Sequence, residues 1–216
     1  MTNRPERLVL VAGTGTEVGK TWVACRLVRA LRRRGLIVAA RKPAQSYDPG
    51  DDLTMTDAAL LAHACGDHPA VVCPQHRWYP VAMAPPMAAE ALGRPPFTVA
   101  DLVGELAWPP AVGVGIVEAA GGVRSPIAAD GDAVDLAAAL HPEHVLLVAD
   151  AGLGTINDVR LSAAALGRWP VIVVLNRFDP EDDLHLRNHE WLAQRDGLTV
   201  VTDPDDLVAP IVGWPS

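Results

Sequence analysis

The sequence predicts a single-domain α/β fold in which a mostly parallel sheet carries helices on both faces. Short apolar runs alternate with helix-like stretches along the whole chain, a pattern typical of strand–helix–strand units. Most of these runs are continuous stretches of Val, Ile and Leu, as expected when a strand is buried on both faces. The 216 residues show no internal repeat and no dividing linker, so we expect one domain over residues 1–216.

The expected elements follow from this alternation in chain order. The apolar runs predict six strands, over residues 8–12, 37–40, 112–117, 145–149, 171–175 and 198–201. The intervening stretches predict helices over residues 21–34, 56–64, 87–92, 99–106, 133–140, 157–166 and 184–195. The Pro-, Met- and Trp-rich segment 69–96 is expected to leave the sheet as a long excursion. Because open parallel sheets bind ligands at the carboxyl ends of their strands, the residues after each apolar run are the candidates for chemistry.

Composition limits the classes of partner. The net charge of −8 argues against sequence-independent binding to nucleic acid. No apolar run reaches the roughly 18 residues of a membrane span, and residues 1–7 lead into the first strand without the apolar core of a signal peptide. We therefore expect a cytoplasmic protein with no nucleic-acid and no membrane partner. Cys25, Cys65 and Cys73 lack a C-x2-C spacing and are expected to be reduced thiols.

A glycine-rich segment, GTGTEVGKT at residues 13–21, stands between the first strand and the first helix. In this context backbone N–H groups at the helix start bind phosphate oxygens, Lys20 reaches the β- and γ-phosphates, and the Thr21 hydroxyl holds Mg²⁺. The segment predicts a P-loop NTPase-like fold, with a loop one residue longer than the common form. The nucleotide-binding residues predicted here are Gly13, Thr14, Gly15, Thr16, Glu17, Val18, Gly19, Lys20, Thr21 and Trp22.

Charged side chains follow the second and third predicted strands. Lys42 stands where a cation would face the γ-phosphate, or it is a surface lysine. Asp57 is either a metal-binding carboxylate or an acidic residue in the first turn of a helix. Glu118 ends an apolar strand, where an acid is rarely buried unless it is paired or binds a metal. Glu118 is therefore predicted to lie on the Mg²⁺ side of the nucleotide, followed by Gly121.

Asn176 and Arg177 follow the fifth predicted strand. The amide of an asparagine offers both a donor and an acceptor to a base. The run Asn176-Arg177-Phe178-Asp179 also matches the guanine-reading N-K-x-D pattern except for its arginine. Both interpretations place this turn at the nucleotide, but they do not decide which base the protein prefers.

Taken in order, these pieces resemble dethiobiotin synthetase. The matching segments are residues 13–21, Lys42-Pro43 with Ser46, Asp57, residues 85–90, residues 117–122, residues 152–157 and Asn176. The resemblance implies an ATP-dependent reaction of 7,8-diaminononanoate with CO2, supplied as bicarbonate. An amine captures CO2 as a carbamate, ATP phosphorylates the carbamate, and the second amine closes the ring of dethiobiotin, with ADP and phosphate as the other products.

The resemblance also implies residue roles. Lys20 and Lys42 would flank the transferred phosphoryl group, Ser46 would position the substrate, and Asn176 would contact the base. The metal ligands would be Thr21, Asp57 and Glu118, holding Mg²⁺ directly or through water. Family members are homodimers, in which the substrate carboxylate would meet Gly154, Thr155, Ile156 and Asn157. The family's C-terminal base-binding segment would correspond to Pro204, Asp205 and Asp206.

Two other functions compete with the synthetase. One is another P-loop enzyme of the cobyrinate-synthetase or partition type; Thr14 and Gly15 stand where a partition ATPase carries its early lysine, and 216 residues leave no room for an amidotransferase domain. The other is a nucleotide-binding paralogue without synthetase activity. Tyr47 and Ala119, where the family usually has glycine, would favour the paralogue.

Overall fold

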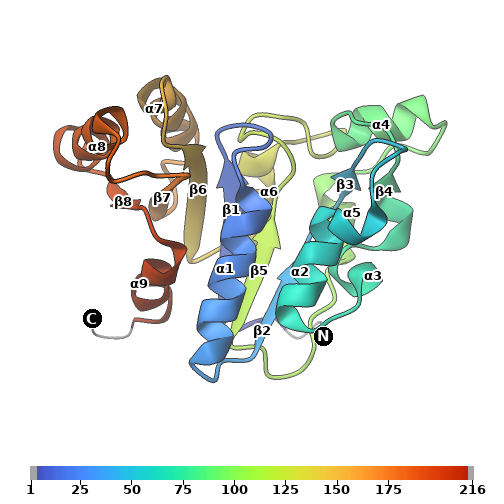
Figure 1. The fold of residues 1–216 in the computed structure, drawn as a ribbon. Helices are drawn as coiled ribbons and strands as arrows, with labels where there is room; N and C mark the ends of the chain where they lie inside the picture. Colours follow the sequence, from blue (N-terminus) through green and yellow to red (C-terminus); the bar gives the residue numbers. More distant parts are fainter. Residues whose placement is uncertain (1–3, 214–216) are drawn as a thin grey trace.

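The structure is a computed structural model that describes residues 4–213, and it contains a six-stranded parallel sheet (Figure 1). The strand order is β2-β5-β1-β6-β7-β8, and each pairing is parallel. The strands are β1 Arg7–Gly13, β2 Val38–Arg41, β5 Val114–Glu118, β6 His144–Asp150, β7 Val171–Asn176 and β8 Thr199–Val201. All six predicted strands are confirmed, together with the α/β fold class. The largest boundary difference is in β5, which begins two residues later than predicted.

All seven predicted helices are present within the described residues. The helices are α1 Lys20–Arg33, α2 Asp57–Cys65, α3 Pro69–Val72, α4 Pro85–Ala91, α5 Val99–Gly104, α6 Ala133–Leu140, α7 Thr155–Ala165, α8 Asp183–Glu190 and α9 Val208–Val212. The short helices α3 and α9 were not predicted, because four or five residues cannot display a helical period. The single helix predicted over residues 184–195 is α-helical only to Glu190, and Trp191–Arg195 continues it as a π-helical turn.

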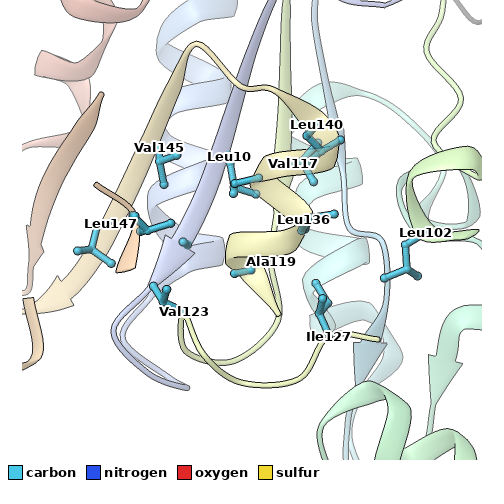
Figure 2. Close-up of a cluster of buried hydrophobic side chains, with 14 of the residues drawn as sticks. Leu10, Leu102, Val117, Ala119, Val123, Ile127, Leu136, Leu140, Val145 and Leu147 are labelled. Atoms are coloured by element: carbon cyan, nitrogen blue, oxygen red, sulfur yellow. The ribbon is translucent and has the colours of Figure 1, made fainter. Parts of the chain in front are cut away.

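Alternate residues of β1 divide the core into two layers. Val9 and Val11 face α1 and α2, whereas Leu8 and Leu10 face the cluster that contains side chains from α5, α6 and α7. Figure 2 shows part of this second cluster, in which Leu10 lies among side chains of β5, β6 and α6. The helices therefore cover both faces of the sheet, as predicted.

The segment 69–96 leaves the main sheet, as predicted from its composition. It contains α3, α4 and the short strand β4, Trp78–Tyr79. Strand β4 pairs in parallel with β3, Gln45–Ser46, to form a separate two-stranded sheet. This pairing fixes the backbone of Gln45 and Ser46 beside the carboxyl end of β2 (Figure 1).

Two features of the described residues concern the state of the cysteines and the possibility of a membrane span. Cys25, Cys65 and Cys73 are buried free thiols. Among residues 4–213, no helix has the length and apolar character needed to cross a bilayer.

Candidate functional site

The glycine-rich loop lies between the end of β1 and the start of α1. Gly19 adopts a left-handed conformation with φ 94°, and a Cβ there would lie 2.0 Å from the Asn176 side-chain nitrogen. Among the described residues, no side chain caps the N-terminus of α1, so its first N–H groups are available to a ligand. The Lys20 ammonium folds back over the loop and donates a 2.7 Å hydrogen bond to the Gly15 carbonyl. This is the geometry of a phosphate-binding loop.

Three oxygen-bearing side chains converge at the first turn of α1. The Thr21 hydroxyl lies 2.7 Å from Asp57 Oδ1 and 2.9 Å from Glu118 Oε1. A hydroxyl has one proton, so Thr21 can donate to only one of these carboxylates at a time. The other Glu118 oxygen, Oε2, is buried and has no hydrogen-bond partner within residues 4–213. A hydroxyl and two carboxylates, one of which keeps an unpartnered oxygen, form a donor set that fits a hard cation such as Mg²⁺.

Lys42 joins these two carboxylates. Its ammonium lies 2.6 Å from Glu118 Oε1 and 2.7 Å from Asp57 Oδ2, and it donates to the Ala119 carbonyl at 3.2 Å. The side chain is 2% exposed and Glu118 is fully buried. Lys42 is therefore held inside the protein by charge, and the surface-lysine alternative is excluded.

Burial and charge shift the pKa values of these groups in different directions. Burial alone would lower the pKa of Lys42, but Asp57 and Glu118 raise it above its ordinary value. Burial raises the pKa of Glu118 despite the attraction of Lys42. Burial would also raise the pKa of Asp57, but Lys42 and the Thr21 hydroxyl hold it below its usual range. Burial and the nearby charge of Lys42 lower the pKa of Lys20 to about 8.

A cavity of about 700 Å³ opens at this edge of the sheet. Its wall combines the phosphate loop with the turns after β2 and β5 and the start of α4. A smaller cavity of about 340 Å³ shares Gln45, Ser46, Tyr47, Asp51 and Asp57 with it. The volume of the larger cavity lies in the range that holds small-molecule ligands.

The cavity brings together part of the predicted site. The predicted residues in its lining are Thr16, Glu17, Gly19, Lys20, Thr21, Lys42, Ser46, Asp57, Glu118, Gly121 and Arg177. The predicted residues outside its lining are Gly13, Thr14, Gly15, Val18, Trp22, Gly154, Thr155, Ile156, Asn157, Asn176, Pro204, Asp205 and Asp206.

Asn176 and Arg177 contact the loop rather than stand free. The Asn176 amide nitrogen donates to the Val18 carbonyl at 2.9 Å. Arg177 donates to the Glu17 carbonyl at 2.7 Å and forms a 2.6 Å ion pair with Asp150. Both residues therefore brace the backbone of the phosphate loop from the end of β7.

Trp22 and the C-terminal segment meet on the outer side of α1. Trp22 is half exposed, and the Arg26 guanidinium lies 5.4 Å from the centre of its ring. Arg26 also lies 3.3 Å from carboxylate oxygens of both Asp203 and Asp205. Pro204, between these aspartates, is buried. One arginine thus connects the predicted base-binding segment to the helix that follows the phosphate loop.

The predicted substrate-carboxylate segment begins α7. Gly154 is left-handed with φ 96° and caps the helix, and the Thr155 hydroxyl is buried without a partner in the described chain. The Asn157 amide donates to its neighbour Asp158 at 3.0 Å. Leu153, directly before this segment, is 91% exposed. The segment therefore presents polar groups beside an exposed apolar side chain.

Several residues in or beside the site were not predicted from the sequence. Gln45, Asp48 and Asp51 line the larger cavity, and Asp150 holds Arg177. Asp150 directly follows the apolar run 145–149, so the strand-end rule could have found it. Gln45 carried no such signal, because the two-residue strand β3 is too short to show a pattern.

A family model and two similar proteins indicate what this chain is related to. A family model described as an AAA domain matches residues 7–203. A protein named ATP-dependent dethiobiotin synthetase BioD from Anaeromyxobacter dehalogenans (strain 2CP-C) is 41% identical, and the match covers 82% of this chain and 79% of the relative. A protein of the same name from Haloferax mediterranei is 39% identical over 92% of this chain and 84% of the relative.

Solved structures give the same architecture. The signal recognition particle receptor FtsY from Elizabethkingia anophelis superposes with a TM-score of 0.54 at 15% identity. Chloroplast FtsY from Physcomitrella patens gives 0.55 at the same identity. In each case the match covers 95% of this chain and 62% of the receptor chain. At this identity the similarity shows a shared P-loop fold.

Proposed function

The chain belongs to the family of ATP-dependent dethiobiotin synthetases, and from this premise we propose how its residues serve the ring-closing reaction. Its activity is the ATP-dependent formation of dethiobiotin, a step of biotin biosynthesis. The names of the relatives favour this activity over a cobyrinate-type or partition-type ATPase and over an inactive paralogue. The observation that carries the proposal is the convergence of Lys42, Asp57 and Glu118 beside the phosphate loop.

The proposed substrates are 7,8-diaminononanoate, CO2 and ATP. One amine of the diamine forms a C–N bond to CO2 and loses a proton, which gives a carbamate. A carbamate oxygen attacks the γ-phosphorus of ATP, the bond to the β,γ-bridging oxygen breaks, and ADP leaves. The second amine then attacks the carbamate carbon, phosphate leaves, and the cyclic urea of dethiobiotin is complete. Such a phosphoryl transfer requires positioning and neutralisation of charge rather than a protein nucleophile.

The two lysines have distinct proposed roles. Lys20 lies over the phosphate loop, and its ammonium would leave the Gly15 carbonyl to contact the β- and γ-phosphates. Lys42 would face the transferred phosphoryl group and the carbamate, held in place by the two carboxylates. The chain contains only these two lysines, and both line the cavity.

Thr21, Asp57 and Glu118 are the proposed holders of Mg²⁺, directly or through water. When bound, the ion would neutralise charge on the phosphate oxygens. Without it, the Lys42 ammonium pairs with both carboxylates, and the Thr21 hydroxyl donates a hydrogen bond to one of them at a time. The unpartnered Oε2 of Glu118 supports this assignment, because a buried carboxylate oxygen is costly to leave without a partner.

We also propose a homodimer in which a second copy completes the substrate site. The segment 154–157 does not line the larger cavity of its own chain, which supports its use by a partner copy. Exposed apolar side chains lie near this segment: Leu153 is 91% exposed and Leu161, on α7, is 68% exposed. Trp191 lies beside α7, because the Arg160 guanidinium is 5.8 Å from its ring, and it is 43% exposed.

The test is a coupled assay of ADP release and dethiobiotin formation. The full chain is supplied with 7,8-diaminononanoate, bicarbonate, Mg²⁺ and ATP, with GTP and CTP in parallel, and Lys42→Met serves as the inactive control. We expect dethiobiotin and ADP in equal amounts, with ADP release dependent on the diamine. ADP release that does not depend on the diamine would indicate another ATPase, and nucleotide binding without turnover would indicate the inactive paralogue.

A further inference from the structure

Gln45 is a buried polar residue at the junction of the two cavities. It lies on β3, where its backbone is paired with Trp78 of β4, and it is 2% exposed. A side chain held this firmly has lost most of its rotational freedom, so its polar groups must be matched by fixed partners.

Only one end of the Gln45 amide has such a partner. The backbone N–H of Ala58 donates to Gln45 Oε1 at 2.9 Å. Because a backbone N–H can only donate, this bond fixes which end of the amide is the oxygen. The nitrogen Nε2 is then a donor with no acceptor among residues 4–213. Leaving a buried donor unsatisfied is unfavourable, so an acceptor supplied by a ligand would remove that cost.

The surroundings indicate where such an acceptor would come from. Gln45 lines both cavities, next to Ser46, whose hydroxyl also has no partner in the described chain. The nearby carboxylate of Asp57 is already bound by Thr21 and Lys42. An oxygen of a bound small molecule is therefore the acceptor that the site lacks.

We propose that Gln45 is a positioning and specificity residue for the diamine: Nε2 donates to an oxygen of the substrate's carbamate, while Oε1 holds the first turn of α2. The second contact matters because Ala58 directly follows Asp57, so the same side chain ties the carbamate position to the carboxylate that binds Lys42. A free diamine has no such oxygen, so Gln45 favours the carbamate form. This inference rests on the proposed synthetase function.

The test compares two variants and a control. Gln45→Glu keeps an oxygen for the Ala58 N–H but, when ionised, loses the donor. Gln45→Met keeps the length of the side chain and loses both contacts. Gln194→Glu makes the same chemical change at an exposed position. The measurements are kcat and KM for the diamine at saturating bicarbonate, KM for ATP, and the midpoint of thermal unfolding.

For Gln45→Glu we expect the diamine KM to rise about tenfold, as for loss of one hydrogen bond to a buried charged group, while the ATP KM stays within about twofold of the wild type. Burial at this position should raise the pKa of the introduced carboxyl, and a protonated carboxyl regains a donor. The ratio of variant to wild-type diamine KM should therefore fall between pH 8 and pH 6. Gln45→Met should raise both KM values, since it also releases α2. Gln194→Glu should behave as the wild type.

Two results would overturn the inference. An unchanged diamine KM in Gln45→Glu would show that Nε2 meets no substrate oxygen. A parallel rise of both KM values in Gln45→Glu, with no change of their ratio to wild type with pH, would reduce Gln45 to a support for α2. Failure of the wild type to form dethiobiotin would instead refute the proposed function, so the two failures are distinguishable.

Discussion

Arg177 donates a 2.7 Å hydrogen bond to the main-chain carbonyl of Glu17, and both residues have left-handed backbones, with φ 57° and 60°. Left-handed geometry is unfavourable for residues other than glycine, so it persists where surrounding contacts hold it. Asp150 supplies one of those contacts through its 2.6 Å ion pair with Arg177. The ends of β6 and β7 therefore hold the glycine-rich loop in a conformation that the loop alone would not favour.

Arg177→Ala should weaken nucleotide binding by loosening this loop. The pair is half exposed, so we expect a modest rise of about two- to fivefold in the Kd for nucleotide. Asp150→Asn should give a similar rise, and the double variant should add little, because both substitutions break one connection. Isothermal titration calorimetry measures all three. The exposed Arg187→Ala, which breaks the Asp183 pair on α8, is the control; fully additive effects would contradict the connection.

Gly19→Ala should abolish nucleotide binding. The added methyl group would lie 2.0 Å from the Asn176 amide nitrogen in a backbone at φ 94°. Gly35→Ala is a matched control, because Gly35 also has a positive φ, 81°, but a Cβ there meets nothing within 4 Å in the described chain. Fluorescent-nucleotide titration should show binding for Gly35→Ala and none for Gly19→Ala. Equal losses in the two variants would mean that backbone strain, not the clash, is responsible.

Nucleotide affinity should fall as the pH rises through the pKa of Lys20. Burial and Lys42 lower this pKa to about 8, so the ammonium loses its proton above that pH in the free protein. Bound phosphates favour the charged form, so binding takes up a proton and the Kd should rise towards about tenfold per pH unit above pH 8. Calorimetry in buffers of different ionisation enthalpy detects this uptake. A Kd independent of pH between 7 and 9.5 would contradict the assignment.

Glu118→Gln should raise the Mg²⁺ concentration needed for half-maximal activity. The substitution removes one buried carboxylate from the proposed metal site, and losses of about 10- to 100-fold accompany changes around metal sites. Glu190→Gln, at an exposed position on α8, should leave the Mg²⁺ dependence unchanged. The measurement is activity as a function of Mg²⁺ concentration. An unchanged Mg²⁺ dependence in Glu118→Gln would show that Glu118 does not hold the metal.

Leu161→Glu should convert the proposed dimer to a monomer. A charge on this exposed side chain of α7 would be buried without a partner in an apolar interface. Ile37→Glu is the control, because Ile37 is similarly exposed before β2, on the opposite edge of the sheet. Sedimentation velocity at micromolar concentration should show a dimer for the wild type and Ile37→Glu. A monomeric wild type would refute the dimer.

The sequence was sufficient for the sheet and for the phosphate loop, because both are local. Continuous apolar runs identify strands buried on two faces, and the spacing of glycines before Lys20 and Thr21 forms a loop within nine consecutive residues. The same local signals failed for α3, α9 and β3, which are too short to display a period. They also did not show that the predicted helix changes from α to π geometry at residues 191–195. The candidates at strand ends followed from a general property of parallel sheets.

Tertiary structure decided how those candidates meet. By its sequence Lys42 could be a surface lysine. In the fold, β2 pairs with β5, and this pairing buries the Lys42 ammonium against Glu118. The sequence predicts that Asn176 contacts a base, and the fold adds a contact that no local pattern indicates, from its amide nitrogen to the Val18 carbonyl. Nε2 of Gln45 is identified as a free donor only because the N–H of Ala58, on α2, donates to Oε1 of the same amide. Local patterns determine strands, helices and loops, whereas charge pairing and hydrogen-bond satisfaction depend on groups distant in sequence, which only the packed chain brings together.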